Sequence, residues 1–401
     1  MRLACIRSVT PPACAALVLQ VVQAQARRIT LRSLHFSMKN IQQNFFKDLT
    51  VIELASVLAG PSVGLFFAEL GAQVIKIENK RTGGDVTRKW KLPNENPDSE
   101  FSAYYHCVNY RKEVQMLDLS SEKDRTQAHA LIREADVVVS NYRPGAAEKL
   151  GMDYTTLKSL NNKLIYAQLN AYAEGDTTPA FDIVLQAEAG FLYMTGEPNR
   201  APVRMPVAMI DLMAAHQLKE GVLLALMHRM KTGEGSYVSA SLFESAVASL
   251  ANQATNWLMV GNIPQRMGTQ HPNIAPYGDL FICEDGKPII LAIGNDKQFS
   301  ELCKHLNCME IADDERFKTN AQRVIHRKLL IKILAPIFQK NRSNEILKIL
   351  KNNNVPAAGV NNMQEVFELP LARNMILEET LPDNTISKRA KTVVFTIDGE
   401  R

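Results

Sequence analysis

The stretch that decides the fold is Thr50–Glu78, TVIELASVLAGPSVGLFFAELGAQVIKIE. It opens with a β-branched, apolar run over residues 50–54 and passes through Ala59-Gly60-Pro61 into a helical pattern over 62–70, which Gly71 closes. A second strand-like run, 73–78, follows at once. A strand, a turn, a helix and a second strand within about thirty residues form a βαβ unit, which requires parallel strands and a right-handed crossover.

The same alternation recurs downstream. We expect strands over 114–119, 136–140 and 164–169, a helix over 121–134, and a helix that Pro144-Gly145 opens. Residues 208–231 are apolar at helical spacing, and 237–261 predict a strand that leads into a long helix. The sequence therefore predicts an α/β fold for the large domain, 48–262, built on a parallel sheet.

Beyond residue 262 the pattern changes to a linker and a smaller α+β domain, 263–372. Strands over 280–283 and 289–293 flank a Glu-Asp-Gly-Lys turn and predict a hairpin. Helices are expected near 296–306, 321–339 and 343–352. Residues 373–401 are expected to return to the large domain, with a strand over 392–397.

Composition excludes several classes of protein. The 401 residues suggest two or three domains, and 46% hydrophobic with 22% charged residues is ordinary for a soluble globular chain. A net charge of +4 is too small to indicate nucleic-acid binding. The six cysteines form no C-x-x-C pair, so we expect no metal site. The longest apolar run, 13–22, is far shorter than the roughly 20 residues that cross a bilayer, so no membrane association is expected.

The N-terminal segment, residues 1–40, has a composition of its own. No acidic residue precedes Asp48, whereas arginines and hydroxyl residues are frequent, which is typical of a mitochondrial transit peptide. Two alternatives stay open: a secretory signal, and an extension upstream of a true start at Met38. The transit reading predicts the mitochondrial matrix, and a start at Met38 predicts the cytoplasm.

The first turn also invites comparison with dinucleotide-binding motifs. Glu78 ends the second strand, where a ribose-binding acid would stand. However, G-x-G-x-x-G and Walker A patterns are absent, and Pro61 removes an N–H that a pyrophosphate would need. An NAD-dependent oxidoreductase is therefore not expected.

Several motifs together resemble a known family. In order, they are LASVLAGPSVGLFFAELGAQVIKIENKRTGGDVTRKW, NYRKEVQMLDL, ADVVVSNYRPGAAEKLGMDY, LIYAQLNAYAEG, FDIVLQAEAGFLYMTGEP, PVRMPVAMIDL and KTGEGSYVSASLFES. This series resembles the family III CoA-transferases, which include carnitine and formyl-CoA transferases, over about residues 48–372. The resemblance implies a Rossmann-like large domain, a smaller domain and a homodimer of interlinked chains. It also implies CoA thioesters and carboxylic acids as substrates, with no permanently bound cofactor.

Cations near the ends of strands are suited to the phosphates of CoA. Five basic residues fall just beyond predicted strands or at helix starts, where an α/β sheet binds ligands: Arg88, Arg111, Lys112, Arg143 and Lys149. Each could instead be a solvated surface charge. The resemblance adds Val57, Leu58, Ala59, Asn109, Tyr110, Asn141 and Tyr142 to the set that lines CoA.

The resemblance implies catalysis through an enzyme carboxylate that forms an anhydride and then a CoA thioester. Family members carry the nucleophilic aspartate three residues after a Thr-Gly pair, and here Thr195-Gly196 places Asn199 at that position. An amide cannot perform this step, so Glu197 becomes a substitute nucleophile, with Asp182 and Asp211 as further acids. Asp182 and Asp211 could alternatively cap the helices that follow them.

Two other functions remain open. Racemases of the same superfamily use a histidine directly before the aspartate that matches Asp182, but here that position is Phe181. Asp211 does match the racemase acid position. A CoA-binding protein without turnover is the remaining alternative. His271 stands where the small domain's substrate loop is expected, either as an acyl-carboxylate contact or as an ordinary loop residue.

Overall fold

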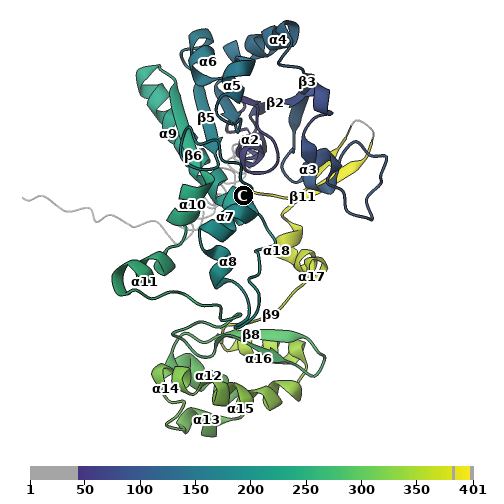
Figure 1. Ribbon diagram of the computed structural model, residues 1–401. Helices are drawn as coiled ribbons and strands as arrows, with labels where there is room; N and C mark the ends of the chain where they lie inside the picture. The colour runs from purple at the N-terminus through teal and green to yellow at the C-terminus, as the bar shows by residue number, and fades with distance from the viewer. Residues whose placement is uncertain (1–43, 382–383, 398–401) are drawn as a thin grey trace, which may run out of the picture. The chain divides into compact units, whose positions relative to one another are not determined.

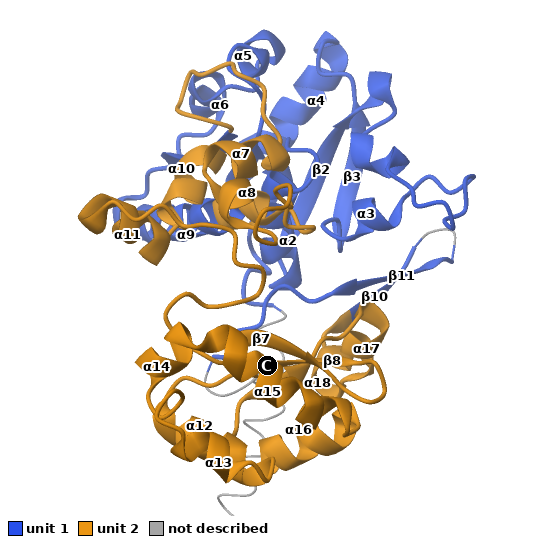
Figure 2. Ribbon diagram, turned by 60° about the horizontal axis from the view of Figure 1, so that its bottom comes forward, with its two compact units in different colours: residues 1–170, 215–239, 377–401 blue, residues 171–214, 240–376 orange. Residues whose placement is uncertain are grey.

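A computed structural model describes residues 44–381 and 384–397, and the predicted N-terminal targeting segment lies outside this part of the chain. The chain divides into two compact units (Figure 2). Unit 1 is drawn from the ranges 1–170, 215–239 and 377–401, and unit 2 from 171–214 and 240–376. A separation of domains between 262 and 263 stays a prediction.

Unit 1 is built on a six-stranded sheet with the order β3-β2-β1-β4-β5-β6. Neighbours among the first five strands pair in parallel; for example, Val51 of β1 pairs with Val74 of β2. The predicted α/β class and the βαβ unit are therefore confirmed. The strands are β1 (Thr50–Glu53), β2 (Gln73–Asn79), β3 (Lys112–Leu117), β4 (Val137–Ser140), β5 (Ile165–Asn170) and β6 (Ser236–Ser241).

Helices cover the sheet (Figure 1). Ile132 of α4 (Glu122–Arg133) and Leu157 of α6 (Tyr154–Leu160) are buried in one core with Ile52 and Ile75 of the sheet. α2 (Ala59–Glu69) packs against β1, β2 and β4. α5 (Ala146–Leu150) begins after Gly145, as the sequence predicted.

The strand order places a ligand site in the sheet. The chain runs outward from β1 to β2 and β3, and then returns to place β4 on the other side of β1. In open parallel sheets, ligands bind at the carboxyl ends of the strands where the order reverses. In unit 1 that point lies between the turn after β1 and the turn after β4.

Unit 2 contains a three-stranded antiparallel sheet of β7 (Tyr277–Ile282), β8 (Pro288–Ala292) and β9 (Ala357–Gly359). The predicted hairpin is confirmed as β7–β8, and β9 was missed because it has only three residues. Around this sheet lie α12 (Asp296–His305), α13 (Met309–Asp313), α14 (Asn320–Ile325), α15 (Arg327–Gln339) and α16 (Ser343–Asn352).

Three predicted elements were wrong. The helix over 321–339 divides at His326 into α14 and α15. The long helix within 237–261 is two short ones, α10 (Leu242–Ala248) and α11 (Asn252–Val260), separated by Ala251 with φ +48°. The hydroxyls of Ser245 and Ser249 donate to carbonyls one turn back, at 2.6 and 2.8 Å, which weakens helix continuity at the break.

The predicted strand over 392–397 is the third error, because only Ile397 forms a bridge. The N–H groups of Thr392 and Val393 donate to the Glu69 carboxylate of α2 instead of to a strand. These contacts still attach the segment to unit 1. The strands of this region are β10 (Ile376–Thr380) and β11 (Ile386–Ala390), which pair with each other.

The remaining helices of the described chain are six α-helices and two short 3₁₀ helices. They are α3 (Ala103–His106), α7 (Asp182–Glu188), α8 (Phe191–Met194), α9 (Met209–Thr232), α17 (Met363–Glu368), α18 (Pro370–Arg373), η1 (Lys80–Thr82) and η2 (Val86–Lys89). In the described ranges, no helix combines the length and apolarity that a membrane crossing requires. The same residues contain no cluster of His, Cys, Asp and Glu that could hold a metal ion.

Candidate functional site

The turn between β1 and α2 lies at the point where the strand order reverses. Val57 adopts a left-handed backbone conformation there, with φ +73°. Asn141, just after β4, accepts the Ser56 N–H at 3.2 Å and donates to the Ser56 carbonyl at 2.9 Å. The Asp85 carboxylate accepts the Val57 N–H at 3.2 Å. Side chains from two other loops therefore hold this turn in place.

The start of α2 offers free hydrogen-bond donors beside this turn. Leu58 and Ala59 are buried, and no acceptor lies within reach of the N–H groups of Leu58, Ala59 or Gly60 in the described part of the chain. A helix N-terminus favours negative charge. The arrangement suits an anionic group of a ligand, with Pro61 as the one position without a donor.

A cavity of about 410 Å³ opens next to the turn. This volume lies in the range of small-ligand pockets. Tyr142, which is half-buried, contributes to the wall. The other lining residues are Leu54, Ala55, Ser56, Lys76, Ile77, Glu78, Asn79, Thr82, Gly84, Asp85, Val86 and Lys89. Of the predicted CoA-lining residues, Tyr142 lines this cavity, and Lys89, which the sequence analysis did not single out, lines it as well.

Beneath the turn, four charged side chains form a buried network. Glu53 Oε1 lies 2.9 Å from Lys76 Nζ, and Glu53 Oε2 lies 2.7 Å from Lys112 Nζ. Lys76 Nζ also lies 3.2 Å from Asp85 Oδ2. Burial opposes the charge of Lys76, but the carboxylates of Glu53 and Asp85 outweigh it and raise its pKa. For Lys112, burial, together with the positive charge of Lys76, outweighs the attraction of Glu53 and lowers the pKa to about 8.

Lys112 was expected to contact CoA, but its donors are already engaged. Besides Glu53, it donates to the Pro61 carbonyl at 2.9 Å and to Asn109 Oδ1 at 3.2 Å. Lys112 and Arg111 were expected to follow a strand. Instead, Lys112 is the first residue of β3, and Arg111 immediately precedes this strand. Lys112 therefore supports the first turn of α2 from below, together with the buried Asn109.

Arg88 is likewise engaged within the protein. Its Nε and Nη2 lie 2.6 and 3.1 Å from the two oxygens of Glu78, and Nη2 also reaches the Tyr105 hydroxyl at 3.0 Å. Glu78 is thus an ion-pair partner rather than a free ribose acceptor. A second cavity of unit 1, about 1070 Å³, is lined by Arg88, Asn109 and Lys112 among others.

The remaining predicted basic residues are exposed. No carboxylate within the described ranges forms an ion pair with the side chains of Arg111, Arg143 or Lys149, although the backbone N–H of Arg111 donates to Glu379. Arg143 lies between β4 and α5, as expected, whereas Lys149 stands near the end of α5 and not at a helix start. Tyr110 is buried beneath the guanidinium of Arg389, whose Cζ is 4.7 Å from the ring centroid. Arg143 and Lys149 remain available to an anionic ligand.

In unit 2, two aspartates meet at the start of α9. Asp182 does not cap α7, the structural alternative to a catalytic role for this residue, because the cap position is Phe181. Its Oδ1 instead accepts the N–H of Ile210 at 2.7 Å and that of Asp211 at 3.4 Å, at the first turn of α9. Its Oδ2 accepts from the Gln186 amide. Asp182 therefore holds the N-terminus of α9 in place.

Asp211 lies in the first turn of α9 and is buried, with 9% of its surface exposed. Burial, and to a lesser extent the neighbouring Asp182 carboxylate, raises its pKa to about 7. No hydrogen-bond donor contacts its side-chain oxygens among the described residues. A desolvated carboxylate without donors is poorly stabilised as an anion, which makes it a reactive group.

Asn199, the predicted nucleophile position, lies in an exposed turn. The Arg200 N–H donates to the Glu197 carbonyl at 3.3 Å, so residues 197–200 form a β-turn. Pro198 occupies its second position, and Asn199, with φ +58°, its third. A type II turn requires a left-handed residue there, and asparagine tolerates that conformation. The turn explains the asparagine without reference to catalysis.

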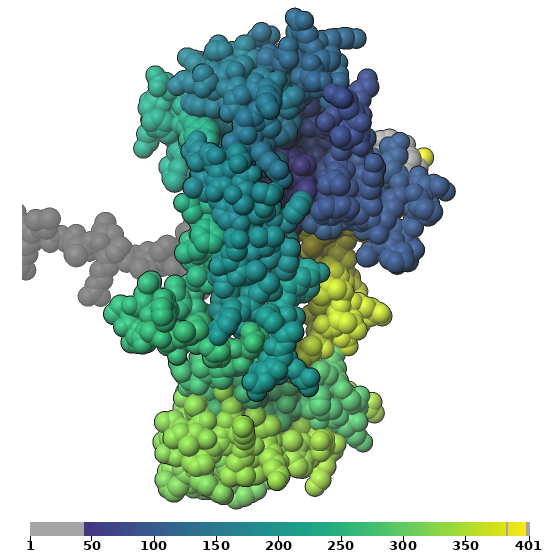
Figure 3. Space-filling view, in the orientation of Figure 1, coloured from purple at the N-terminus to yellow at the C-terminus, as the bar shows by residue number. Residues whose placement is uncertain are grey.

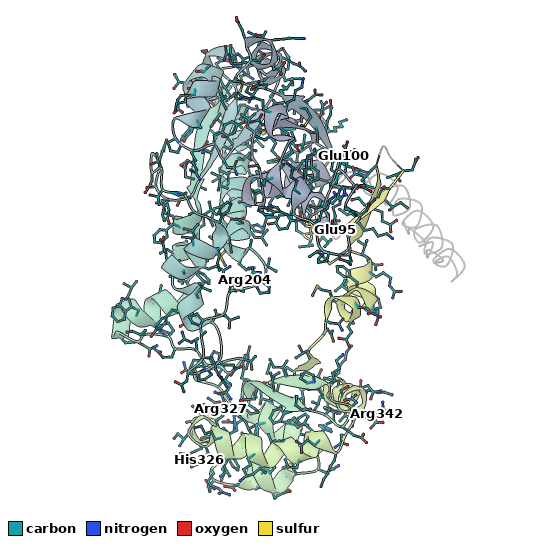
Figure 4. The ribbon with its side chains drawn as sticks, turned by 45° about the vertical axis from the view of Figure 1, so that its right-hand side comes forward. Glu95, Glu100, Arg204, His326, Arg327 and Arg342 are labelled. Carbon is teal, nitrogen blue, oxygen red and sulfur yellow. The ribbon has the colours of Figure 1, made fainter. Side chains whose placement is uncertain are left out.

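Glu197 is exposed and packs against a second loop. Gly268 donates its N–H to the Gly196 carbonyl at 2.9 Å and has φ +60°. A Cβ at Gly268 would lie 2.7 Å from Glu197 Oε1. Arg204 lies on the segment that leads from this turn to α9 (Figure 4). The loops that contain Gly196 and Gly268 therefore meet through a backbone hydrogen bond, and the Glu197 side chain packs against Gly268 beside this bond.

His271 belongs to the loop that precedes β7. Its carbonyl accepts from Arg327, whose guanidinium also reaches the Ile274 and Tyr277 carbonyls. Arg327 opens α15 next to His326 (Figure 4). The ring of His271 packs edge-on against Tyr277, with a centroid distance of 5.3 Å. These contacts give the loop a fixed conformation.

Comparisons with known proteins agree on a single family. The model of CoA-transferase family III matches residues 46–400. The chain is 38% identical to a succinate–glutarate CoA-transferase of Agrobacterium fabrum, over 86% of this chain and 88% of that protein. It is 34% identical to a human succinyl-CoA:glutarate CoA-transferase, over 86% and 78% of the two chains.

A solved structure agrees with these relatives. The crystal structure of a CaiB/BaiF family protein from Brucella suis superposes with a TM-score of 0.79 at 34% identity, covering 90% of this chain and 94% of that one. The range matched by the family model, residues 46–400, includes the turn after β1 and both aspartates at the start of α9. The chain belongs to CoA-transferase family III.

Proposed function

We propose that this protein transfers CoA from an acyl-CoA to a carboxylic acid, with Asp211 as the nucleophile. The observation that carries the assignment is the buried Asp211 carboxylate, with its raised pKa and no donor on its oxygens. Glu197 is exposed, Asn199 is a turn residue, and Asp182 is occupied by backbone N–H groups. The family and the two CoA-transferase relatives support the reaction class.

The reaction proceeds in balanced steps. The Asp211 carboxylate attacks the thioester carbonyl, a C–O bond forms, the C–S bond breaks, and CoA leaves as the thiolate. The thiolate then attacks the Asp211 carbonyl of the anhydride, which releases the first acid as a carboxylate and leaves an aspartyl-CoA thioester. The acceptor carboxylate repeats both steps in reverse order, so the exchange needs no net proton or electron. Dividing one exchange into these steps is covalent catalysis.

We propose dicarboxylic acids as acceptors. The support comes from the relatives, whose names specify succinate and glutarate. The test incubates the purified protein with succinyl-CoA and a panel of mono- and dicarboxylic acids, and follows new acyl-CoA species by mass spectrometry. New dicarboxyl-CoA supports the proposal. Deuterium exchange at an α-carbon without new acyl-CoA would indicate a racemase-like isomerase instead, and CoA binding without either reaction would indicate a protein without turnover.

The pH profile of exchange provides a first prediction. Only ionised Asp211 is nucleophilic, and its pKa lies at about 7. We expect kcat/KM to fall about tenfold per pH unit below that value and to level off above it. The measurement is the initial rate of exchange between pH 5.5 and 9. A flat profile down to pH 5.5 would indicate a carboxylate with an ordinary pKa, such as an exposed glutamate.

Substitutions in the 197–200 turn provide a second prediction. We expect Asn199→Asp and Glu197→Gln each to leave kcat/KM within about threefold of wild type, because exposed positions outside the reacting groups have small effects. Exchange assays under identical conditions measure this. If Asn199→Asp increases the rate strongly, or Glu197→Gln abolishes it, the nucleophile belongs to this turn and not to α9.

Assembly as a homodimer is part of the proposal. α11 exposes a run of large apolar side chains, Trp257, Leu258, Met259 and Val260, of which the last three are at least 75% exposed. The helix lies at the molecular surface, at the left in Figure 3. An apolar patch of this kind is typical of an interface. Light scattering at micromolar concentration tests it, and a monomeric mass would contradict it.

The proposed location is the mitochondrial matrix, on the basis of the acid-free N-terminal composition. Residues 1–48 fused to a fluorescent protein test this by microscopy. Diffuse cytoplasmic fluorescence would favour a start at Met38.

A further inference from the structure

The backbone at Val57 is unusual for its residue type. Among the described residues with positive φ other than glycine, Val57 is the only β-branched one. The left-handed region is sterically unfavourable for L-residues, and most of all for β-branched and bulky ones. Such a conformation persists only where surrounding contacts fix it, and it is common at ligand sites.

The contacts that fix Val57 converge on Asp85. Asp85 Oδ2 accepts the Val57 N–H at 3.2 Å, and Oδ1 accepts from both the N–H and the hydroxyl of Thr87, at 3.0 and 2.8 Å. Lys76 donates to the Ala55 carbonyl at 2.6 Å while it pairs with Asp85. The lysine thus joins the carboxylate to the strand end that leads into the turn.

These bonds determine which backbone groups remain free. Because Asp85 takes the Val57 N–H and Asn141 takes the Ser56 N–H, the unpaired donors are those of Leu58, Ala59 and Gly60, as described above. The conformation of Val57 determines the direction in which these three N–H groups point. If Val57 returned to an ordinary φ, the start of α2 would reorient relative to the cavity beside it.

We infer that Asp85 is a positioning residue, which holds the turn after β1 in the conformation that binds CoA. The inference rests on the proposed function, because CoA is the ligand of that function. Without Asp85, the steric preference of valine draws the turn toward other conformations. The apparent affinity for CoA then falls in proportion to the population that remains competent to bind.

The test exploits the different preferences of valine and glycine. Glycine occupies the left-handed region without a steric penalty, so it no longer needs the Asp85 contact. We compare wild type, Asp85→Ala, and the double variant Asp85→Ala/Val57→Gly. The readouts are the Kd for CoA by isothermal titration calorimetry, and KM and kcat with succinyl-CoA. Asp85→Leu, which also lacks an acceptor for the Val57 N–H, replaces Asp85→Ala if the latter does not fold.

We expect Asp85→Ala to raise the Kd and the KM about tenfold or more, with kcat at saturation within about threefold of wild type. Adding Val57→Gly is expected to return the Kd to within about threefold of wild type. Tyr166→Phe is the matched control, because it removes another buried hydrogen bond of unit 1, from the Tyr166 hydroxyl to the Met152 carbonyl at 2.9 Å. It should lower the melting temperature and leave the Kd unchanged.

An unchanged Kd in folded Asp85→Ala would overturn the inference. A double variant that binds CoA as weakly as Asp85→Ala would also overturn it, because the loss would then not act through Val57. The Kd is independent of turnover, which separates the two proposals. If wild type binds CoA without exchange, the proposed function fails while the role of Asp85 is still measured.

Discussion

Asp211→Asn is expected to abolish CoA exchange and, at the same time, to stabilise the fold at pH 8. The amide cannot attack a thioester, and loss of a covalent nucleophile lowers kcat by about 10⁴-fold or more in well-studied enzymes. Asp176→Asn is the matched control, because Asp176 lies in an exposed loop of unit 2 and accepts hydrogen bonds from Thr178, two residues further on. The control should exchange CoA at the wild-type rate.

The stability effect of the same substitution has a defined pH dependence. The Asp211 pKa is raised from 3.8 to about 7 by folding, so the folded state binds this proton more tightly than the unfolded chain does. The protonated Asp211 carboxyl therefore contributes fully to the stability of the folded state below about pH 4, and this contribution is lost as the pH rises through about 7. At pH 8 the asparagine variant should melt at least about 2 °C higher than wild type. At pH 4 the two should melt together, and a lower melting temperature at pH 8 would show that ionised Asp211 has stabilising partners.

Glu53→Gln is expected to have the largest effect on stability. Each oxygen of Glu53 binds one ammonium group, Lys76 at 2.9 Å and Lys112 at 2.7 Å, and all three side chains are buried. Glutamine offers one oxygen and turns an NH₂ group toward the other ammonium. Breaking a buried ion pair by neutralising one partner costs about 3–5 kcal/mol. Chemical denaturation at pH 7 measures this loss.

The matched control is Glu301→Gln in unit 2. Glu301 pairs with Lys304 at 3.7 Å on the exposed surface of α12. Exposed pairs of this kind contribute about 1 kcal/mol or less. If both substitutions cost the same small amount, water has access to the Glu53 network and the account of the turn above it would need revision.

The features of the fold that were predicted correctly are those that depend on the local pattern of apolar residues. The βαβ unit over 50–78 follows from short-range alternation of apolar residues, and it reappears with the expected parallel pairing. The helix break at Ala251 and the division at His326 were missed because apolar periodicity continues through both positions. At these positions, hydroxyl and loop contacts override the helical pattern.

The site depended on contacts between residues far apart in the chain. Lysine is a residue type that often binds phosphate, yet in the structure Lys112 pairs with Glu53, which lies 59 residues earlier in the chain. Likewise, Asn199 attracted attention by its place after Thr195-Gly196, although its φ of +58° explains the residue type. The desolvation that distinguishes Asp211 from Glu197 comes from packing, which one sequence does not display. A nearby signal did exist in the apolar residues Val207–Ile210 that directly precede Asp211.

The most direct test of the central claim is to locate the covalent intermediate. The protein is incubated with succinyl-CoA, treated with borohydride to reduce an acyl thioester to an alcohol, and digested with trypsin. The peptide 205–219 contains Asp211 as its only carboxylate side chain, whereas Asp182 and Glu197 both lie in the peptide 164–200. We predict conversion of Asp211 to homoserine in the first peptide. Reduction confined to the second peptide would contradict the account.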